Sequence, residues 1–432
     1  MYWQQELETM PVEALRALQL SRLQTSVRRA ITSPYYQQLY QQRGITADDL
    51  NTLDDVKRLP FTTKQDLRNG YPYGFLTVPK TEVVRLHSSS GTTGQATVIF
   101  HTAADIRDWA NLMARCMYMT GARNSDVFQN MSGYGMFTGG LGFHYGAELL
   151  GMLTVPAGSG NSKRQIHYMK DFQTSVIHII PSYALHMISV FEEEKVNPRD
   201  LHLRIAFLGA EPHTEHTRKR VEDAFGVKAF NSYGLSEMYG PGVAFECPEQ
   251  NGLHIWEDSY FVEVINPDTL EPVADGEIGE LVLTTLTREA MPLIRYRTRD
   301  LTSISSEPCP CGRTHRRIAR IKGRSDDMLI IKGVNVFPMQ VEAVLMSIPE
   351  VGTNYQIELE TVENIDVMTV NVEVRDDFFL GDVKGLTALQ QKITNALKSE
   401  VLFTPKVKLV EPDSIPEAQG KAVRVIDRRV AH

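Results

Sequence analysis

Residues 205–233 read IAFLGAEPHTEHTRKRVEDAFGVKAFNSY, and this stretch decides the class of fold. It contains an apolar run at 205–208, an amphipathic stretch at 214–225, and a second apolar run at 229–233. Short apolar runs that alternate with helical patterns are typical of parallel strands joined by helices. We therefore expect a strand, a helix and a second strand here, with both strands in one sheet.

The same alternation extends back to about residue 83. Further apolar runs occupy residues 127–131, 152–155 and 176–180, and residues 104–119 show helical spacing. Strands and helices that alternate at this spacing form mostly parallel sheets with helices on both faces. The sequence therefore predicts an α/β fold.

The flanking regions have a different texture. The first 80 residues are polar with helical spacing, whereas from about 252 to 305 the helical periodicity disappears and turn signals separate strand-like runs. The latter pattern predicts an antiparallel, barrel-like sheet. After Gly323 one helix, two strands, a helix and a strand follow, which predicts a small α+β domain. The expected domains are a large one, residues 1–325, with a helical segment at 1–80, and a small one, residues 326–432.

Composition limits the classes of function. The chain has 432 residues, of which 42% are hydrophobic and 23% charged, and its formal net charge is −8. Such proportions exclude a disordered chain. The excess of acid argues against a protein that acts on nucleic acid or on an anionic membrane surface, because both select basic proteins.

The compartment is also suggested by the sequence. Four cysteines are too few for a disulfide scaffold and fit a reducing environment. The N-terminus MYWQQELETM carries acid and amide side chains where a signal peptide carries lysine and an apolar run. No stretch approaches 18 uninterrupted apolar residues. We expect a soluble, cytoplasmic protein.

A loop rich in hydroxyl groups and glycine follows the apolar run at 83–86 and precedes the run at 97–100. Its residues are Ser88, Ser89, Ser90, Gly91, Thr92, Thr93 and Gly94. Glycine lets the backbone approach an anion, and the hydroxyls donate hydrogen bonds to its oxygens, so the loop suits a polyphosphate. It is not a Walker loop, because no Gly-Lys-Ser/Thr follows. A flexible linker is the alternative, but a linker would not lie between two strands of a sheet.

This loop resembles the phosphate-binding loop of adenylate-forming enzymes, the group of acyl-CoA synthetases, luciferases and peptide-synthetase adenylation domains. Further motifs appear in the order of that family: residues 231–237 (NSYGLSE), 296–300 (YRTRD), 323–327 (GRSDD) and 420–421 (GK). Within the group the chain most resembles phenylacetate–coenzyme A ligases. The segments that carry this resemblance are 61–68 (FTTKQDLR), 134–140 (YGMFTGG), 209–212 (GAEP), 252–254 (GLH), 308–314 (PCPCGRT) and 420–427 (GKAVRVID).

The resemblance implies a two-step reaction. A carboxylate attacks the α-phosphorus of ATP and gives an acyl-adenylate and pyrophosphate, and the thiol of coenzyme A then displaces AMP. The first step brings an anion toward a polyanion, so cations and amide dipoles must surround the phosphates.

The resemblance also implies catalytic residues. Glu237 is the expected ligand of Mg²⁺, a hard cation that prefers oxygen. Lys421 is the candidate catalytic lysine, which enters with the small domain for adenylation only. Many family members have a lysine directly after the phosphate loop, whereas this chain has Gln95-Ala96-Thr97 there. We expect Lys64 to supply the missing positive charge.

Nucleotide contacts follow from the same resemblance. Tyr233 is expected to lie against the adenine, Asp300 to accept hydrogen bonds from the ribose hydroxyls, and Arg324 to contact phosphate or ribose. Asp326 matches the hinge position about which a mobile small domain turns. The remaining nucleotide contacts are expected from Gly209, Ala210, Glu211 and Pro212, which line the base pocket, and from Asn231, Ser232, Gly234 and Ser236.

The acyl pocket is expected near residues 134–140, where aromatic residues and glycines follow a strand. Tyr134, Phe137 and Gly139 are the candidate contacts. This mixture suits a flat, apolar acid. The family name implies phenylacetate, and a substituted ring or a longer arylalkanoate stays open.

The cysteines form a second constellation. Cys309 and Cys311 flank Pro310 in a tight turn, and Cys247 precedes His254 by seven residues. Three sulfurs and one imidazole make a closed tetrahedral set that would hold a structural Zn²⁺. His315 is the rival fourth ligand, and unrelated reduced cysteines are the alternative. Cys116, in an amphipathic stretch, is expected to be a core thiol.

Two other functions deserve comparison. Six basic residues between 313 and 324 beside the Cys-Pro-Cys turn resemble a zinc-stabilised nucleic-acid module. The net charge and the ATP motifs argue against that function. An adenylating enzyme that loads a carrier protein instead of coenzyme A is the nearer alternative. The oligomeric state stays open, with a homodimer as one candidate.

Overall fold

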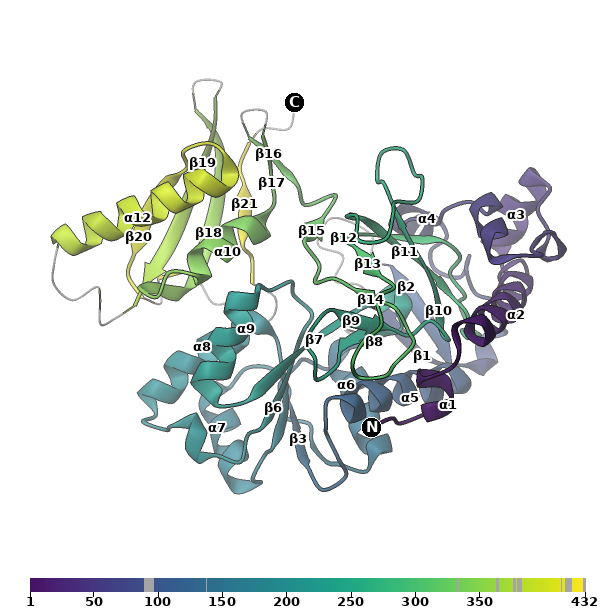
Figure 1. Cartoon of the computed structure of the whole chain (residues 1–432), viewed down its shortest axis with the longest axis horizontal. Helices are drawn as coiled ribbons and strands as arrows, with labels where there is room; N and C mark the ends of the chain where they lie inside the picture. The colour runs from purple at the N-terminus through teal and green to yellow at the C-terminus, as the bar shows by residue number, and fades with distance from the viewer. Residues whose placement is uncertain are drawn as a thin grey trace.

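The computed structural model describes residues 1–88, 97–136, 138–331, 334–362, 365–375, 378, 383–412, 414–415 and 422–429. A large N-terminal part and a small C-terminal part, which lies beside α8 and α9, are visible in Figure 1. The helices are α1 (Gln5–Glu8), α2 (Val12–Ala30), α3 (Pro34–Arg43), α4 (Lys64–Asn69), α5 (Ala103–Met119), α6 (Thr138–Leu150), α7 (Ser162–Asp171), α8 (Pro181–Glu193), α9 (Glu215–Phe225), α10 (Pro338–Met346) and α12 (Val383–Val401). Short 3₁₀ turns include η1 (Ala47–Asp49), η2 (Leu53–Arg58), η3 (Lys80–Glu82), η4 (Pro198–Asp200) and η5 (Ser236–Met238).

A nine-stranded sheet forms the centre of the large part. Its strands, in spatial order, are β13 (Ile304–Ser305), β14 (Arg317–Ile318), β9 (Leu253–Ile255), β8 (Gly240–Glu246), β7 (Lys228–Leu235), β6 (Ile205–Gly209), β5 (Val176–Ile179), β3 (Val127–Asn130) and β4 (Leu153–Val155). The strands from β7 to β4 are parallel, and β8, β9, β14 and β13 pair antiparallel. The predicted mostly parallel sheet is therefore confirmed for the stretch in which strands and helices alternate.

Helices cover both faces of this sheet, as the sequence predicts. Alternate residues of β6 point to opposite sides: Phe207 belongs to one apolar cluster with α5 and α6, and Leu208 belongs to a second cluster with α7, α8 and α9. The helix α9 begins after Thr214, whose hydroxyl accepts a hydrogen bond from the amide of Thr217, and ends at Gly226 with φ +71°. Thr214 is thereby held at the carboxyl-end edge of the sheet.

The predicted barrel-like region is a four-stranded antiparallel sheet. Its strands, in spatial order, are β10 (Tyr260–Ile265), β11 (Gly279–Thr285), β12 (Tyr296–Thr302) and β15 (Gly323–Arg324). The N-terminal helix α2 packs beside β10 and β11, where Ser26 donates to the carbonyl of Thr285 at 2.6 Å. A hairpin of β1 (Val83–Ser88) and β2 (Val98–Thr102) flanks the predicted phosphate loop.

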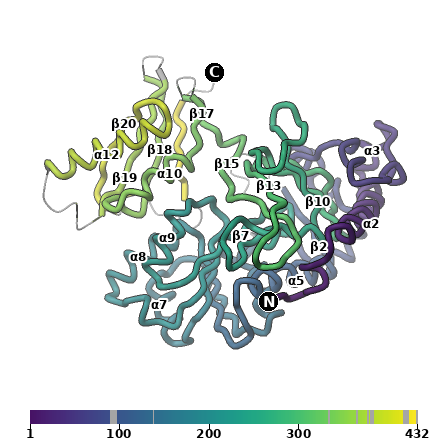
Figure 2. The backbone as a smooth tube through the Cα atoms, in the orientation of Figure 1, coloured from purple at the N-terminus to yellow at the C-terminus, as the bar shows by residue number. Residues whose placement is uncertain are grey.

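The small C-terminal part is an α+β unit, as predicted. Its four-stranded sheet has the order β20 (Lys406–Val410), β19 (Ile365–Val374), β18 (Val351–Val362) and β21 (Val425–Asp427), next to a hairpin of β16 (Leu329–Ile331) and β17 (Val334–Val336). The backbone tube in Figure 2 shows that this sheet and its helix α10 lie close to α8 and α9, and α12 (Val383–Val401) packs against α10. Residues of α8, α9, α10 and β18 share one apolar cluster, so the two parts are in direct contact.

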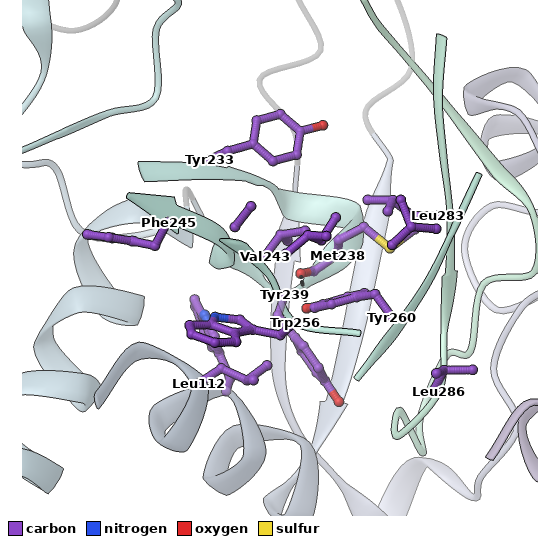
Figure 3. Close-up of a cluster of buried hydrophobic side chains, with 14 of the residues drawn as sticks. Leu112, Tyr233, Met238, Tyr239, Val243, Phe245, Trp256, Tyr260, Leu283 and Leu286 are labelled. Atoms are coloured by element: carbon purple, nitrogen blue, oxygen red, sulfur yellow. Dashed lines mark hydrogen bonds between the residues drawn. The ribbon is translucent and has the colours of Figure 1, made fainter. Parts of the chain in front are cut away.

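The core beneath the nucleotide motifs is aromatic. Figure 3 shows Met238, Tyr239, Trp256 and Tyr260 gathered on one side of the β7–β8 ribbon, with Tyr233 on the other side. The hydroxyl of Tyr260 donates to the carbonyl of Met238 at 3.0 Å and thereby fixes the turn that follows β7. Among the described residues, no helix is long and apolar enough to span a bilayer.

Candidate active site

The adjacent ends of β6 and β7 bring two predicted motifs together. Gly209 pairs with Ser232 in register, and a side chain at Gly209 would place its Cβ 3.0 Å from the Ser232 carbonyl oxygen. Ala210 continues with φ +72°, which turns the chain away from the sheet. The carboxyl ends of strands in open α/β sheets are where ligands bind. Residues 209–212 and 231–236 thus share one edge of the sheet.

Tyr233, Asp300 and Arg324 converge although they lie on three different strands. The Tyr233 hydroxyl donates to Asp300 Oδ2 at 2.6 Å, and Arg324 Nη1 lies 3.5 Å from Asp300 Oδ1. Burial raises the pKa of Asp300 to about 6, and Arg324 opposes part of that rise. Burial also raises the pKa of Tyr233, so this hydroxyl stays a donor. The group can present a buried carboxylate to vicinal hydroxyls.

The predicted hinge residue lies beside this group. Both carboxylate oxygens of Asp326 accept from the Arg324 guanidinium, from Nε and from Nη2, at 2.8 Å each. Arg324 therefore bridges Asp300 of β12 and Asp326, the predicted hinge residue.

Glu237 and Lys64 face each other across the site. Glu237 is 5% exposed in the turn η5, and Lys64 Nζ lies 3.9 Å from its Oε1. Lys64 begins α4, whose position is fixed because the backbone of Thr62 exchanges hydrogen bonds with Arg295 and Arg297. A buried carboxylate with a cation beside it is a suitable donor for Mg²⁺ at a polyphosphate.

Arg288 is a functional candidate that the sequence did not reveal. Its side chain is completely buried, Nη1 donates to the Glu237 carbonyl at 2.6 Å, and its guanidinium lies 4.1 Å from the centre of the Tyr239 ring. It therefore fixes the backbone that carries Glu237. No motif surrounds Arg288, so only the fold relates it to the site.

Glu211 contacts both the start of α8 and the small part. Its Oε2 accepts from the Ser182 amide at the start of α8 at 3.1 Å, and its Oε1 accepts from the Ala422 amide of the small part at 2.8 Å. Glu211 is predicted from the sequence to line the base pocket, and these two partners are not predicted. The contact places the chain directly after residue 421 at the site.

Several predicted site residues lie outside the described residues: Ser89, Ser90, Gly91, Thr92, Thr93, Gly94, Phe137 and Lys421. Ser88, the first residue of the predicted phosphate loop, donates its amide to the carbonyl of Met136 at 3.1 Å. The end of β1 therefore lies directly beside the predicted acyl segment.

Tyr134 and Gly139 of that segment lie near the end of β3. The Tyr134 hydroxyl accepts from Asn130 Nδ2 at 3.0 Å, and its ring packs edge-on against His144, with centroids 5.8 Å apart. Burial raises the pKa of Tyr134 to about 12. Gly139 is buried in the first turn of α6. Both residues are positioned by the strand–helix connection that the sequence predicts.

The four predicted zinc ligands lie close together in the structure. One ligand atom from each of Cys247, His254, Cys309 and Cys311 lies within 4.8 Å of every other. His254 Nδ1 donates to the His315 carbonyl at 2.9 Å, which leaves Nε2 facing Cys311 Sγ at 3.2 Å. The rival His315 is outside the set, because its Nδ1 accepts from the Glu257 amide and its Nε2 donates to the Leu7 carbonyl. Cys116 is buried and accepts from Trp256 Nε1, as expected of a core thiol.

The basic run beside this set does not form a nucleic-acid surface. Four of its five arginines pair with acids of the same chain: Arg313 with Glu8, Arg316 with Glu257, Arg320 with Glu246, and Arg324 with Asp326. The fifth, Arg317, donates to the carbonyls of Asn251 and Glu307. The sequence did not predict Glu8, which is fully buried and also accepts from the amides of Trp3 and Gln4. These ion pairs exclude the nucleic-acid module as an interpretation of the run.

Comparisons with known proteins agree with this geometry. Residues 42–286 match the family described as AMP-binding enzyme, and residues 333–429 match the AMP-binding enzyme C-terminal domain. A phenylacetate-coenzyme A ligase of Thermus thermophilus is 47% identical, with 99% of this chain and 100% of that protein covered. The enzyme of the same name from Escherichia coli K12 is 43% identical, with 98% and 97% covered.

Solved structures give the same result. A 2-hydroxyisobutyryl-CoA ligase in the postadenylation state, in complex with 2-HIB-AMP, superposes with a TM-score of 0.94 at 30% identity, covering 99% of this chain and 92% of that one. The same enzyme in the thioesterification state, with 2-HIB-AMP and CoA, gives a TM-score of 0.74 at 31% identity, with the same coverage. This chain is therefore an AMP-forming acid–CoA ligase and belongs to the phenylacetate–coenzyme A ligases of the AMP-binding enzyme family.

Proposed function

We propose that this chain converts phenylacetate, or a closely related aryl-acetic acid, to its coenzyme A thioester through an acyl-adenylate. The observation that carries the proposal is the convergence of Glu237, Lys64, Tyr233 and Asp300 at the carboxyl ends of β6 and β7. The choice of acid is supported by four phenylacetate-coenzyme A ligases that are 43–47% identical over nearly the whole chain.

The first half-reaction needs positive charge where the acid approaches the α-phosphate. Lys64 supplies one cation, and Glu237 would hold Mg²⁺, which neutralises phosphate oxygens when bound. Asp300 accepts from the ribose hydroxyls, and the Tyr233 ring lies against the base. The loop of residues 88–94 donates to the phosphates, and Lys421 reaches the reacting carboxylate.

The second half-reaction requires Lys421 to give way to the thiol of coenzyme A. We propose that the chain consists of a large domain, residues 1–325, and a small domain, residues 326–432, that turns about Asp326. The pairing of Asp326 with Arg324 supports this hinge, because its two hydrogen bonds must alter when the backbone there turns. Loading of a carrier protein is the alternative, since it differs only in the acceptor thiol.

The acid would bind near the end of β3, where Tyr134 and Gly139 lie, and Phe137 is the third candidate contact. A tyrosine ring packed edge-on against His144 offers a flat apolar wall, and a glycine leaves room for a ring. This arrangement supports an aryl acid.

We also propose a structural Zn²⁺ held by Cys247, His254, Cys309 and Cys311. Four close donors leave no open position, and the His254 Nδ1–H bond to a carbonyl orients the ring for coordination through Nε2. When bound, zinc cross-links the chain near residue 250 to the turn near residue 310. The thiolates that it needs fit a reducing cytoplasm. A homodimer stays a prediction that no observation tests.

The proposal is tested with purified protein, ATP, Mg²⁺ and a panel of aryl acids. Phenylacetate should give the highest kcat/KM, AMP and pyrophosphate should appear in equal amounts, and coenzyme A should be preferred over a pantetheinylated carrier protein. Release of ADP, or turnover that does not depend on an aryl acid, would contradict the proposal. A preference for the carrier protein would favour the alternative.

A further inference from the structure

Two carboxylates join the large and small parts, and each part contributes one of them. Glu211, after β6, accepts from the Ala422 amide of the small part at 2.8 Å. Glu342, on α10 of the small part, reaches the first turn of α9 in the large part. Neither interaction belongs to the contacts expected of ATP or of the acid.

Glu342 is only 8% exposed, and its buried carboxylate accepts hydrogen bonds from three donors. Its Oε1 accepts from the Thr217 hydroxyl at 2.9 Å and from the Thr214 amide at 3.4 Å, and its Oε2 accepts from the Tyr355 hydroxyl at 3.1 Å. The Thr214 amide lies at the N-terminus of α9, where unpaired amides and the helix dipole favour a negative group. The carboxylate therefore joins α10 and β18 of the small part to α9 of the large part.

The same face has further contacts between the two parts. Arg220 of α9 donates from Nη1 to the Gly352 carbonyl at 3.1 Å and from Nη2 to the Val351 carbonyl at 3.0 Å. Arg424 lies two residues after Ala422 and directly before β21, and its guanidinium carbon is 4.4 Å from the centre of the Tyr355 ring. The groups around Glu342 therefore continue toward the segment that follows Lys421.

We propose that Glu342 is a positioning residue for the first half-reaction. By binding the start of α9, it holds the small part where Glu211 binds Ala422, so that Lys421 is delivered to the site. This inference rests on the proposed role of Lys421 in adenylation. The contact then exists in only one of two arrangements of the large and small parts, the one used for adenylation. It must break before coenzyme A attacks.

The comparison with one relative in two states supports this assignment. The chain superposes on the 2-hydroxyisobutyryl-CoA ligase with a TM-score of 0.94 in its postadenylation state but 0.74 in its thioesterification state. Both TM-scores come from the same relative at nearly the same sequence identity. The difference between them therefore reflects the conformation of that relative and not its sequence. The contacts of Glu342 and Glu211 belong to the arrangement with the higher score.

The test separates the two half-reactions. Adenylation is measured as acid-dependent exchange of pyrophosphate into ATP, and thioester formation as AMP release from supplied acyl-adenylate and coenzyme A. Glu342→Ala should slow the first by about tenfold to hundredfold, because three buried donors lose their acceptor. The second should change less than about twofold, because the proposed arrangement is not used there.

Three variants complete the design. Glu342→Gln keeps a carbonyl acceptor and should retain most of the adenylation rate. Thr217→Val removes one donor from the opposite side of the contact and should reproduce the selective loss even where Glu342→Ala folds poorly. Glu358→Ala is the matched control, because this half-buried acid of β18 pairs with Arg428, which also belongs to the small part, and neither half-reaction should change.

Equal losses in both half-reactions for Glu342→Ala and Thr217→Val, or unchanged adenylation in both, would overturn the inference. A failure of the proposed function is distinguishable from this result. If Lys421→Ala leaves adenylation intact, the role of the lysine is wrong, whatever the Glu342 variants do.

Discussion

Tyr233→Phe should change the pH dependence of ATP use in a direction that the structure dictates. The Tyr233 hydroxyl donates to Asp300 at 2.6 Å inside a buried site, and the pKa of Asp300 is raised to about 6. The proposed ribose contact needs the ionised carboxylate. Therefore kcat/KM for ATP should fall as the pH falls through about 6, since this parameter reports groups of the free enzyme.

The size of the effect follows from the hydrogen bond. A hydrogen bond to a charged group contributes about 1.5–3 kcal/mol, and about 1.4 kcal/mol corresponds to one pH unit. Because the hydroxyl stabilises the ionised carboxylate, its loss should move the acidic limb of the profile upward by about one unit or more. At pH 8.5 the variant should approach the wild-type value, whereas near pH 7 it should be clearly slower.

The assay is a series of kcat/KM measurements for ATP between pH 5 and 9, with melting temperatures recorded at each pH. Asp300 has a higher pKa in the folded chain than its ordinary value of 3.8, so its protonation below about 6 favours the folded state. Protonation of Asp300 below about pH 6 can therefore lower the activity without unfolding the chain. Asp300→Asn should abolish this limb and be slow at every pH. An acidic limb that stays in place, or moves downward, in Tyr233→Phe would refute the reasoning.

Three further predictions follow from the contacts. Cys311→Ser should lower the zinc content from about one per chain and the melting temperature together, because metal-binding energy is folding energy; full stability of metal-free wild type would contradict this. Lys64→Ala should reduce the adenylation rate by about tenfold or more and spare AMP release from supplied acyl-adenylate, as a lost phosphate counter-charge requires; equal loss in both assays would indicate a structural role. Glu8→Ala should lower the free energy of unfolding by about 3 kcal/mol in urea titration, because Arg313 is left buried without its acid. Arg28→Ala, which breaks the exposed pair with Asp48, should change it by less than about 1 kcal/mol; similar losses in these two variants would contradict the burial argument.

Sequence patterns predicted the parts of the site that depend on local order. The run ending at Leu208 and the run through Tyr233 are adjacent parallel strands, so the motifs at their ends had to meet at one edge. The cysteine set was predictable because the chain has only four cysteines, two of which flank a single proline. The choice of His254 over His315 was not, since it depends on which ring nitrogens the backbone engages.

Long-range partners could not be predicted. Glu8, Arg288 and Glu342 carry no motif, and each acquires its function from a residue more than 50 positions away. Glu211 belongs to a predicted motif, yet its contact with Ala422 joins residues 211 positions apart. The contacts of Glu342 and Glu211 depend on how the small and large parts meet, and those of Glu8 and Arg288 depend on how distant elements of the large part pack. No local pattern encodes either.

The central claim is that the acid is activated as an adenylate, and the fate of its oxygen tests this most directly. The reaction is run with phenylacetate carrying ¹⁸O in its carboxylate, ATP, Mg²⁺ and coenzyme A, and the products are examined by mass spectrometry. Attack on the α-phosphorus followed by thiol attack at the acyl carbon leaves one carboxylate oxygen on phosphorus. The account therefore predicts one ¹⁸O atom in AMP and none in pyrophosphate. ¹⁸O in orthophosphate together with ADP, or AMP without ¹⁸O, would contradict it.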